Sequence, residues 1–172
     1  ASYRKLYAFM MSTSAVLTAL HIAVAFTPLY YFVVEGMIGA PQEIVEPARI
    51  GLQIMTPWTW SIAYRRFKQG VLIRFGHPRA VTVGTLIRLS ADLIVLAIGF
   101  TLGNIPGIVV ATSAVAAGVV SEAIFAGLRA RPVIRDELRR AAPVEPALTF
   151  SAFMKFYIPL AFTSLLALLI QP

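Results

Sequence analysis

Residues 80–102, AVTVGTLIRLSADLIVLAIGFTL, and residues 105–128, IPGIVVATSAVAAGVVSEAIFAGL, decide the fold of this chain. Together they contain only three ionisable side chains, Arg88, Asp92 and Glu122. A helix rises about 1.5 Å per residue, so about 20 residues cross the roughly 30 Å of hydrocarbon in a lipid bilayer. Both stretches are therefore predicted to be membrane-spanning helices.

Three further runs are also apolar, with few ionisable side chains. They cover residues 8–34, 50–64 and 147–170. The whole chain is 58% hydrophobic and 13% charged, whereas soluble domains are about a quarter charged. Strands of a membrane barrel are disfavoured, because these runs are continuously apolar and do not alternate. The sequence therefore predicts an all-α fold, a polytopic bundle of about five transmembrane helices surrounded by membrane lipids.

Prolines and cations interrupt two of these runs. Pro28 is expected to kink the first helix, because proline lacks the backbone N–H and its ring crowds the preceding turn. The second run is short unless it continues to residue 73, which would require Arg65, Arg66 and Lys68 to snorkel to the lipid headgroups. Small residues at 111–118 of the fourth run would let neighbouring helices approach closely in lipid.

The charge distribution predicts the orientation of the bundle. The 15 Lys and Arg residues give a formal net charge of +7 and gather between the apolar runs. Residues 65–79 and 129–140 hold five cations each, and Arg4 and Lys5 precede the first run. Because Lys and Arg are retained on the cytoplasmic side, we expect a plasma (inner) membrane protein with a cytoplasmic N-terminus. The same pattern argues against nucleic-acid binding.

The segment 129–146, with three prolines and five arginines, is expected to be a cytoplasmic linker between two bundles. Residues 1–128 would then be the four-helix part of an N-terminal lobe, and residues 147–172 would be the first helix of a second lobe. The last apolar run ends without a polar tail. We therefore expect the chain to be a fragment of a longer protein.

No motif in the sequence specifies a reaction. The chain has no cysteine. It also lacks a phosphate-binding glycine loop, histidines paired at metal-ligand spacing and a serine elbow. An intramembrane enzyme would need an adjacent nucleophile and base. We therefore expect no enzyme activity, no catalytic residue, no metal and no cofactor.

Ionisable residues inside the apolar runs are the main functional candidates, because a charge at the bilayer centre costs at least about 2.5 kcal/mol. Arg88 and Asp92 are four residues apart and share one helix face, where they form either a structural ion pair or a substrate or proton site. Glu122 either pairs with a linker arginine at the membrane interface or faces a cavity. Lys155 is expected to snorkel to the cytoplasmic interface.

Aromatic and histidine side chains are weaker candidates. Trp58, Trp60 and Tyr64 either pack and anchor the bundle at the interface or stack on a ligand. His21 stands alone on an apolar helix, where a packed or hydrogen-bonded role is expected. No metal site is predicted from either group.

Four stretches of the chain, taken together, show an order of features that is similar to that of a known family. They are residues 27–44 (TPLYYFVVEGMIGAPQEI), 48–95 (ARIGLQIMTPWTWSIAYRRFKQGVLIRFGHPRAVTVGTLIRLSADLIV), 105–128 and 153–172 (FMKFYIPLAFTSLLALLIQP). This order has three marks. A proline lies within a helix, a QGVLIRFGHPRA turn lies on the cytoplasmic side, and a FYIPLAFTSLL segment opens a new bundle. The order resembles the multidrug/oligosaccharidyl-lipid/polysaccharide flippase superfamily, in particular the MATE transporters and the related progressive ankylosis proteins.

The resemblance implies a transporter of about twelve helices in two lobes, of which this chain would supply helices three to seven. It implies alternating access and proton- or sodium-coupled export of a small organic molecule or lipid-linked substrate. Asp92 would carry the coupling ion, with Arg88 as its partner or as a contact for an anionic substrate, and Glu122 would be a second candidate. The partners would be the remaining helices of a longer transporter, or partner subunits.

A non-transporting membrane scaffold or assembly subunit is the alternative. Its support is the five-helix architecture together with the small residues of the fourth run, since such residues mediate helix association in lipid. Replacing Arg88 and Asp92 together would leave the function of a scaffold intact, whereas it would damage a transporter.

Overall fold

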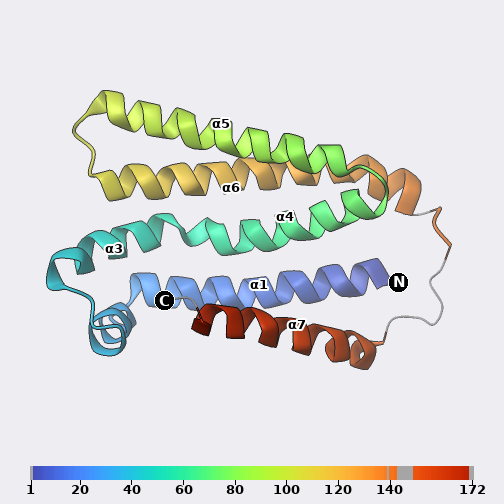
Figure 1. The fold of residues 1–172 in the computed structure, drawn as a ribbon, viewed down its shortest axis with the longest axis horizontal. Helices are drawn as coiled ribbons and strands as arrows, with labels where there is room; N and C mark the ends of the chain where they lie inside the picture. Colours follow the sequence, from blue (N-terminus) through green and yellow to red (C-terminus); the bar gives the residue numbers. More distant parts are fainter. Residues whose placement is uncertain (1, 139, 143–148, 171–172) are drawn as a thin grey trace.

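The computed structural model describes residues 2–138, 140–142 and 149–170. Within these residues the chain forms seven α-helices and two π-helical segments, and no β-strand (Figure 1). The elements are α1 (Ser2–Phe26), α2 (Leu29–Tyr31), η1 (Phe32–Met37), α3 (Gln42–Ile54), α4 (Thr56–Arg74), α5 (Pro78–Leu102), α6 (Gly107–Pro132), η2 (Val133–Leu138) and α7 (Phe150–Ile170). The prediction of an all-α fold is confirmed.

The long helices lie side by side in a layer, in which α5 is antiparallel to α6 and α4 is antiparallel to α1, whereas α6 and α4 run in the same direction, as do α1 and α7 (Figure 1). Across the layer the order is α5, α6, α4, α1 and α7, and α3 continues the line of α4. α6 is the central element, because it packs against α3, α4 and α5. α1 packs against α4, and the Phe9 ring on α1 contacts the Phe153 ring on α7 at 4.9 Å between centroids.

Three helices in the described part of the chain are long and apolar enough to cross a membrane. They are Tyr3–Phe26, Pro78–Leu102 and Gly107–Leu138. Only 6% of an apolar 18-residue stretch of α5 is buried within the chain, and Phe100 on this helix is 87% exposed. An exposed apolar surface of this extent is compatible with a location in lipid.

The second predicted run is two helices in the structure, separated at Met55. Pro57 has no N–H to donate to the carbonyl of Gln53 four residues earlier, and the Thr56 hydroxyl donates to that carbonyl at 2.6 Å instead. α4 then continues to Arg74 and is too highly charged to count as an apolar span. The fifth predicted run begins at residues 147–148, which lie outside the described residues. Three of the five predicted spans are therefore confirmed as possible spans.

Pro28 ends the first helix rather than kinking it. α1 stops at Phe26, short of the predicted end at residue 34, and the chain then turns into the short α2 and η1 (Figure 1). The buried Tyr30 hydroxyl donates to the carbonyl of Val45 at 2.6 Å. This contact fastens the turn to α3.

A polar network holds this end of the bundle together. The Tyr31 hydroxyl donates to Glu46 at 2.6 Å and accepts a hydrogen bond from Arg49 at 2.7 Å. Arg49 also donates to the carbonyl of Ala25 at 3.3 Å. The hydrogen bond to Glu46 raises the pKa of Tyr31 above its ordinary value. The network joins the end of α1 to α2 and α3.

At the opposite end, α6 continues into the segment predicted as a linker. The linker role of residues 129–146 stays a prediction, but residues 129–138 are helical, as the end of α6 and as η2. The reason is burial, because Ala130 and Val133 pack with Leu72 in an apolar cluster. Residues 139 and 143–146 of the predicted linker lie outside the described residues.

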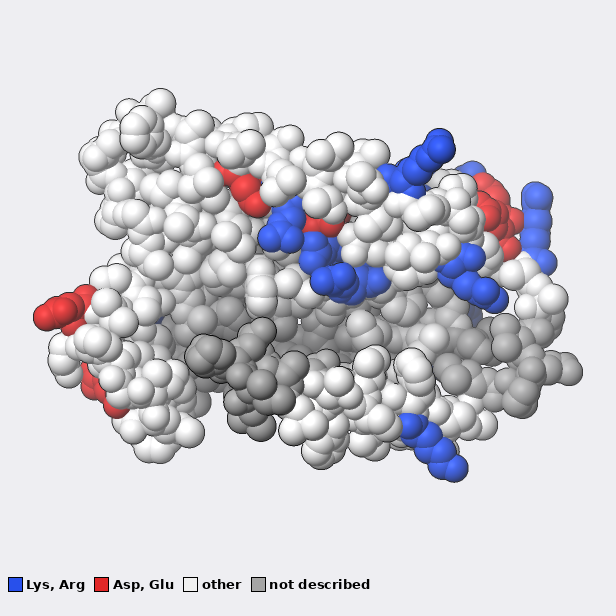
Figure 2. Space-filling model, viewed as in Figure 1, with Lys and Arg blue, Asp and Glu red and all other residues white. Residues whose placement is uncertain are grey.

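The basic segments lie at one end of the bundle. The N-terminus, the turn between α4 and α5 and the end of α6 meet there (Figure 1). Figure 2 shows Lys and Arg in the centre and right half of one face, with acidic residues among them, and further acidic residues at the left end. The charge asymmetry is therefore present in three dimensions, and the side that faces the cytoplasm stays a prediction.

Candidate functional site

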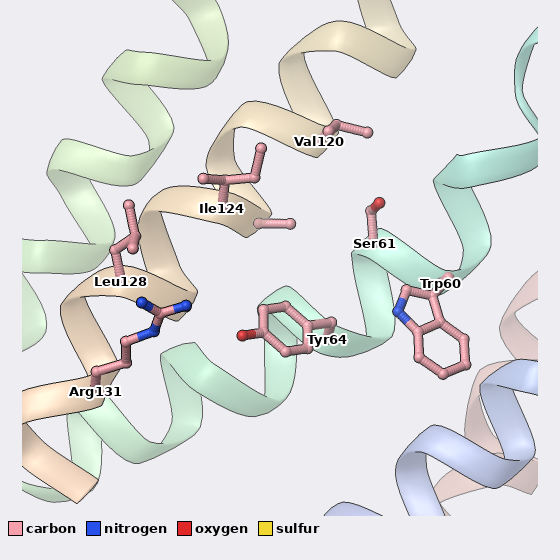
Figure 3. A pocket seen from close by; sticks show the side chains of 9 residues that line it. Trp60, Ser61, Tyr64, Val120, Ile124, Leu128 and Arg131 are labelled. Carbon is pink, nitrogen blue, oxygen red and sulfur yellow. The ribbon is translucent and has the colours of Figure 1, made fainter. Parts of the chain in front are cut away.

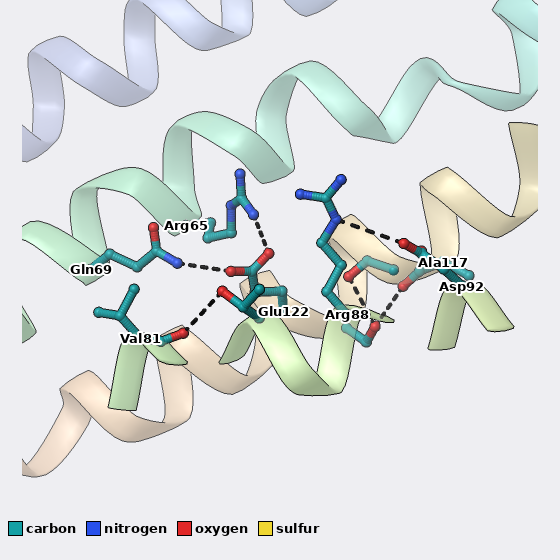
Figure 4. Close-up of polar contacts among 10 residues, drawn as sticks. Arg65, Gln69, Val81, Arg88, Asp92, Ala117 and Glu122 are labelled. Carbon is teal, nitrogen blue, oxygen red and sulfur yellow. Dashed lines mark hydrogen bonds and ion pairs between the residues drawn. The ribbon is translucent and has the colours of Figure 1, made fainter. Parts of the chain in front are cut away.

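A cluster of polar side chains lies between α4 and α6. Arg65 and Gln69 are four residues apart on α4 and point from one helix face towards Glu122 of α6 (Figure 4). Arg65 donates to Glu122 Oε2 in an ion pair, and Gln69 Nε2 donates to Oε1 at 2.9 Å. Both carboxylate oxygens of Glu122 therefore have a donor.

The charged side chains of the cluster are buried inside the bundle. Glu122 is 1% exposed, and Arg65 is 6% exposed. Gly84 on α5 lies against this side chain, and a Cβ atom at this position would lie 3.4 Å from Glu122 Cγ, an ordinary contact distance. Taking either charge out of water is unfavourable, and the pair is tolerated only because each charge has a partner.

A second ion pair lies on α5 beside this cluster (Figure 4). Arg88 Nε is 3.8 Å from Asp92 Oδ2, so the pairing predicted from their spacing is confirmed. The pair is loose, because Arg88 Nε and Asp92 Oδ1 are buried without a hydrogen-bond partner in the described structure. Asp92 therefore has one carboxylate oxygen free to accept.

Close contact between α5 and α6 explains the position of Asp92. Gly118 on α6 faces the carboxylate, and a Cβ atom added to Gly118 would lie 1.8 Å from Asp92 Oδ1. Ala114, one turn earlier, is 2% exposed. The small residues of α6 thus bring the two helices together, and the carboxylate occupies the space that a larger side chain would take.

The partner of Glu122 differs from the expected one. Glu122 was predicted to pair with a linker arginine or to face a cavity, and in the structure it pairs with Arg65 and Gln69 inside the bundle. The extension of the second run to residue 73 would have required Arg65 and Lys68 to snorkel to the headgroups, but in the structure both are buried. The spacing of Arg65 and Gln69 by one helical turn was the signal for a shared inward face.

Lys68 lies among aromatic rings. Its ammonium nitrogen lies 5.8, 4.9 and 5.2 Å from the ring centroids of Tyr3, Tyr7 and Tyr64, and it donates to the Tyr3 hydroxyl at 3.1 Å. Cation–π attraction of this kind strengthens when the cation is removed from water. Tyr64 therefore contributes to holding Lys68 in place.

His21 forms the hydrogen-bonded contacts expected of it. Nε2 lies 2.8 Å from the carbonyl of Leu52, so this nitrogen carries the proton, and Nδ1 lies 3.4 Å from the Thr59 hydroxyl. Leu52 is three residues before the break at Met55. His21 thus joins α1 to both sides of the break between α3 and α4.

The remaining candidates lie apart from the charged cluster. Trp58 lines a groove of about 310 Å³ between α1, α4 and α7. Lys155 is exposed on α7 and forms no ion pair with another described residue. Neither of these side chains contacts Glu122 or Asp92, and their roles stay predictions.

No cofactor or metal geometry is found in the described residues. No three His, Asp or Glu side chains of this part lie together as a metal site would require. A comparison with protein-family models, with curated proteins and with solved structures found no match. The charged cluster is therefore the feature of the described residues that bears most directly on function.

Proposed function

We propose that the chain is part of a membrane secondary transporter or flippase that works by alternating access. The observation that carries the proposal is the set of four ionisable side chains between α4, α5 and α6. They are Arg65, Arg88, Asp92 and Glu122. Replacing a buried ion pair with apolar residues often leaves stability unchanged or improved, so stability alone does not account for this cluster. Intramembrane ionisable groups commonly line substrate or ion pathways.

The hydrogen bonds of Glu122 and Asp92 indicate which of the two carboxylates is better able to take up a cation. Both oxygens of Glu122 already accept from α4, whereas Asp92 Oδ1 has no partner within the described residues. Asp92 is therefore the better group to take up a proton or sodium ion, and neutralising it would release Arg88. Glu122 and Arg65 would keep α4 and α6 together during the cycle.

The wider architecture of the proposal is MATE-like. In it, the chain supplies helices three to seven of about twelve, and the remaining helices or partner subunits complete a central cavity. The substrate is a small organic molecule or a lipid-linked compound, exported in exchange for protons or sodium. The basic end of the bundle faces the cytoplasm of the cell, as the positive-inside rule indicates.

A scaffold without transport activity is the second candidate, and the structure removes one of its supports. Of the small residues at 111–118, Ala114, Ala116 and Gly118 are buried within the bundle, and Gly118 faces Asp92 of α5. A partner helix would have to use another face.

Transport measurements in proteoliposomes test the proposal. Ethidium and a fluorescent short-chain phospholipid are suitable first probes of an organic-molecule exporter and a flippase, with the complete gene product reconstituted. We expect flux of one probe that stops when the proton and sodium gradients are collapsed, and at least about a tenfold slower flux in the Asp92→Asn variant. The Glu35→Gln variant, outside the cluster, is the control.

Flux that needs ATP, or that is equal in the Asp92→Asn variant and the unaltered protein, would contradict the proposed mechanism. A scaffold would show no flux of any probe while keeping its assembly with partner subunits.

A further inference from the structure

A cavity of about 270 Å³ opens between α4 and α6, and none of the ion-paired residues of the candidate site lines it. Trp60 and Tyr64 line it from α4, and Ile124, Leu128 and Arg131 line it from α6 (Figure 3). Ile124 and Leu128 are 58% and 52% exposed. The cavity is therefore accessible from the side of the bundle.

The polar groups of the cavity are positively charged or hydrogen-bond donors. In Figure 3 the Arg131 guanidinium points towards the Tyr64 hydroxyl. No Asp or Glu lines the cavity, and Arg131 forms no ion pair with another described residue. Arg131 is also close enough to Lys68 for their charges to repel. An anion beside Arg131 would relieve this repulsion.

The apolar groups of the cavity extend in one direction from this cation. Along α6, the lining residues run from Arg131 back through Leu128 and Ile124 to Val120, a helical distance of roughly 16 Å. A ligand that fits both ends has an anionic head and an apolar tail. The Arg131 end belongs to the basic end of the bundle, where lipid headgroups would lie if the helices span a bilayer.

We propose that this cavity binds an anionic phospholipid of the surrounding membrane. The phosphate accepts from Arg131 and from the Tyr64 hydroxyl, and an acyl chain lies along Leu128 and Ile124. Basic pockets between transmembrane helices on the cytoplasmic side are suited to such headgroups. The lipid is a bound component of the bundle and not its cargo, so the proposal does not depend on transport activity.

Tryptophan fluorescence offers a direct test, because Trp58 and Trp60 are the only two tryptophans of the chain. In a Trp58→Phe variant the single reporter, Trp60, lines this cavity. The variant is reconstituted in phosphatidylcholine vesicles that contain brominated phosphatidylglycerol or, at the same fraction, brominated phosphatidylcholine. We expect about a fivefold preference for the anionic lipid in the quenching of Trp60, the effect of about one arginine near an anionic headgroup.

Two arginine variants distinguish a site from a general attraction to the basic end. In the Trp58→Phe background, Arg131→Gln should abolish the preference, and Arg129→Gln should keep it, because Arg129 does not line the cavity. Equal quenching by the two lipids would overturn the proposal, as would equal losses in the two variants. Displacement by millimolar inorganic phosphate would also overturn it, since free phosphate would then be the ligand.

Discussion

At the scale of single residues, the molecule is organised around charges that are paired inside an apolar bundle. Glu122 accepts from Arg65 and from Gln69, and each of the three side chains is less than a tenth exposed. An isolated charge at this depth would be strongly destabilising, whereas a pair is tolerated. The stability of the bundle is therefore sensitive to the loss of one partner and much less sensitive to the loss of both.

This sensitivity can be measured by a double-mutant cycle. We expect Glu122→Leu and Arg65→Met, each made alone, to lower the free energy of unfolding by about 3–5 kcal/mol, because each leaves its partner buried without a counter-charge. The double variant Arg65→Met with Glu122→Leu should lose much less. The measurement is denaturant unfolding in detergent micelles, followed by circular dichroism.

The control for this cycle is Glu35→Gln, which changes the same charge in the η1 segment and should be nearly silent. Additive losses in the double variant would show that Arg65 and Glu122 are not energetically coupled.

The sequence predicted one of the two ion pairs and missed the partner of the other. Arg88 and Asp92 are four residues apart, so helical geometry alone brings them together. Glu122 and Arg65 are 57 residues apart, and charge counting assigned Arg65 to a connector. Only the packing of α4 on α6 places Arg65 inside, and single-sequence patterns do not reveal the packing of distant helices.

At the scale of elements, the approach of α5 to α6 depends on the glycine at position 118. A Cβ atom there would overlap Asp92 Oδ1, so a larger residue must move either the carboxylate or the helix. Gly70, one turn before the end of α4, has no atom within 4 Å of its would-be Cβ. The two glycines form a matched pair for a test.

We expect Gly118→Ala to destabilise the bundle by about 1–3 kcal/mol through overpacking. Gly70→Ala should instead stabilise it by about 0.5–1 kcal/mol, because alanine is the better helix former. Thermal unfolding in detergent measures both changes. Gly118→Ala should cost much less in an Asp92→Ala background than in the unaltered protein, and an equal cost in the two backgrounds would place the clash elsewhere.

Element boundaries were predicted least well, and proline is the common reason. Pro28 was expected to bend a helix and instead ends it, because the turn that follows is fastened by Tyr30 to α3. Pro57 divides the second run into α3 and α4. A proline signals a missing hydrogen bond, but tertiary contacts decide whether the helix bends, breaks or stops.

At the scale of the whole molecule, the basic segments meet at one end of a layer of helices (Figure 1). If the layer crosses a membrane, the turn at residues 75–77 and the η2 segment lie on one side, and the turn between η1 and α3 lies on the other. The chain contains no cysteine, so single cysteines can be introduced without further changes.

We expect a membrane-impermeant thiol reagent to label Arg74→Cys and Arg135→Cys from one side only, and Glu43→Cys from the other side only. The expected contrast is at least about tenfold, since the hydrocarbon excludes a charged reagent. Intact inside-out and right-side-out vesicles provide the two measurements. Labelling of all three positions from the same side would show that the layer does not span the membrane.

The helical continuation of α6 through η2 has a geometric consequence. The continuous segment Gly107–Leu138 has 32 residues and is roughly 48 Å long at helical rise, whereas the hydrocarbon is about 30 Å thick. If α6 stands upright in a bilayer, roughly 18 Å of it projects as a stalk beyond the hydrocarbon. Whatever the chain builds after this stalk starts from the aqueous phase and is held at a defined height above the lipid.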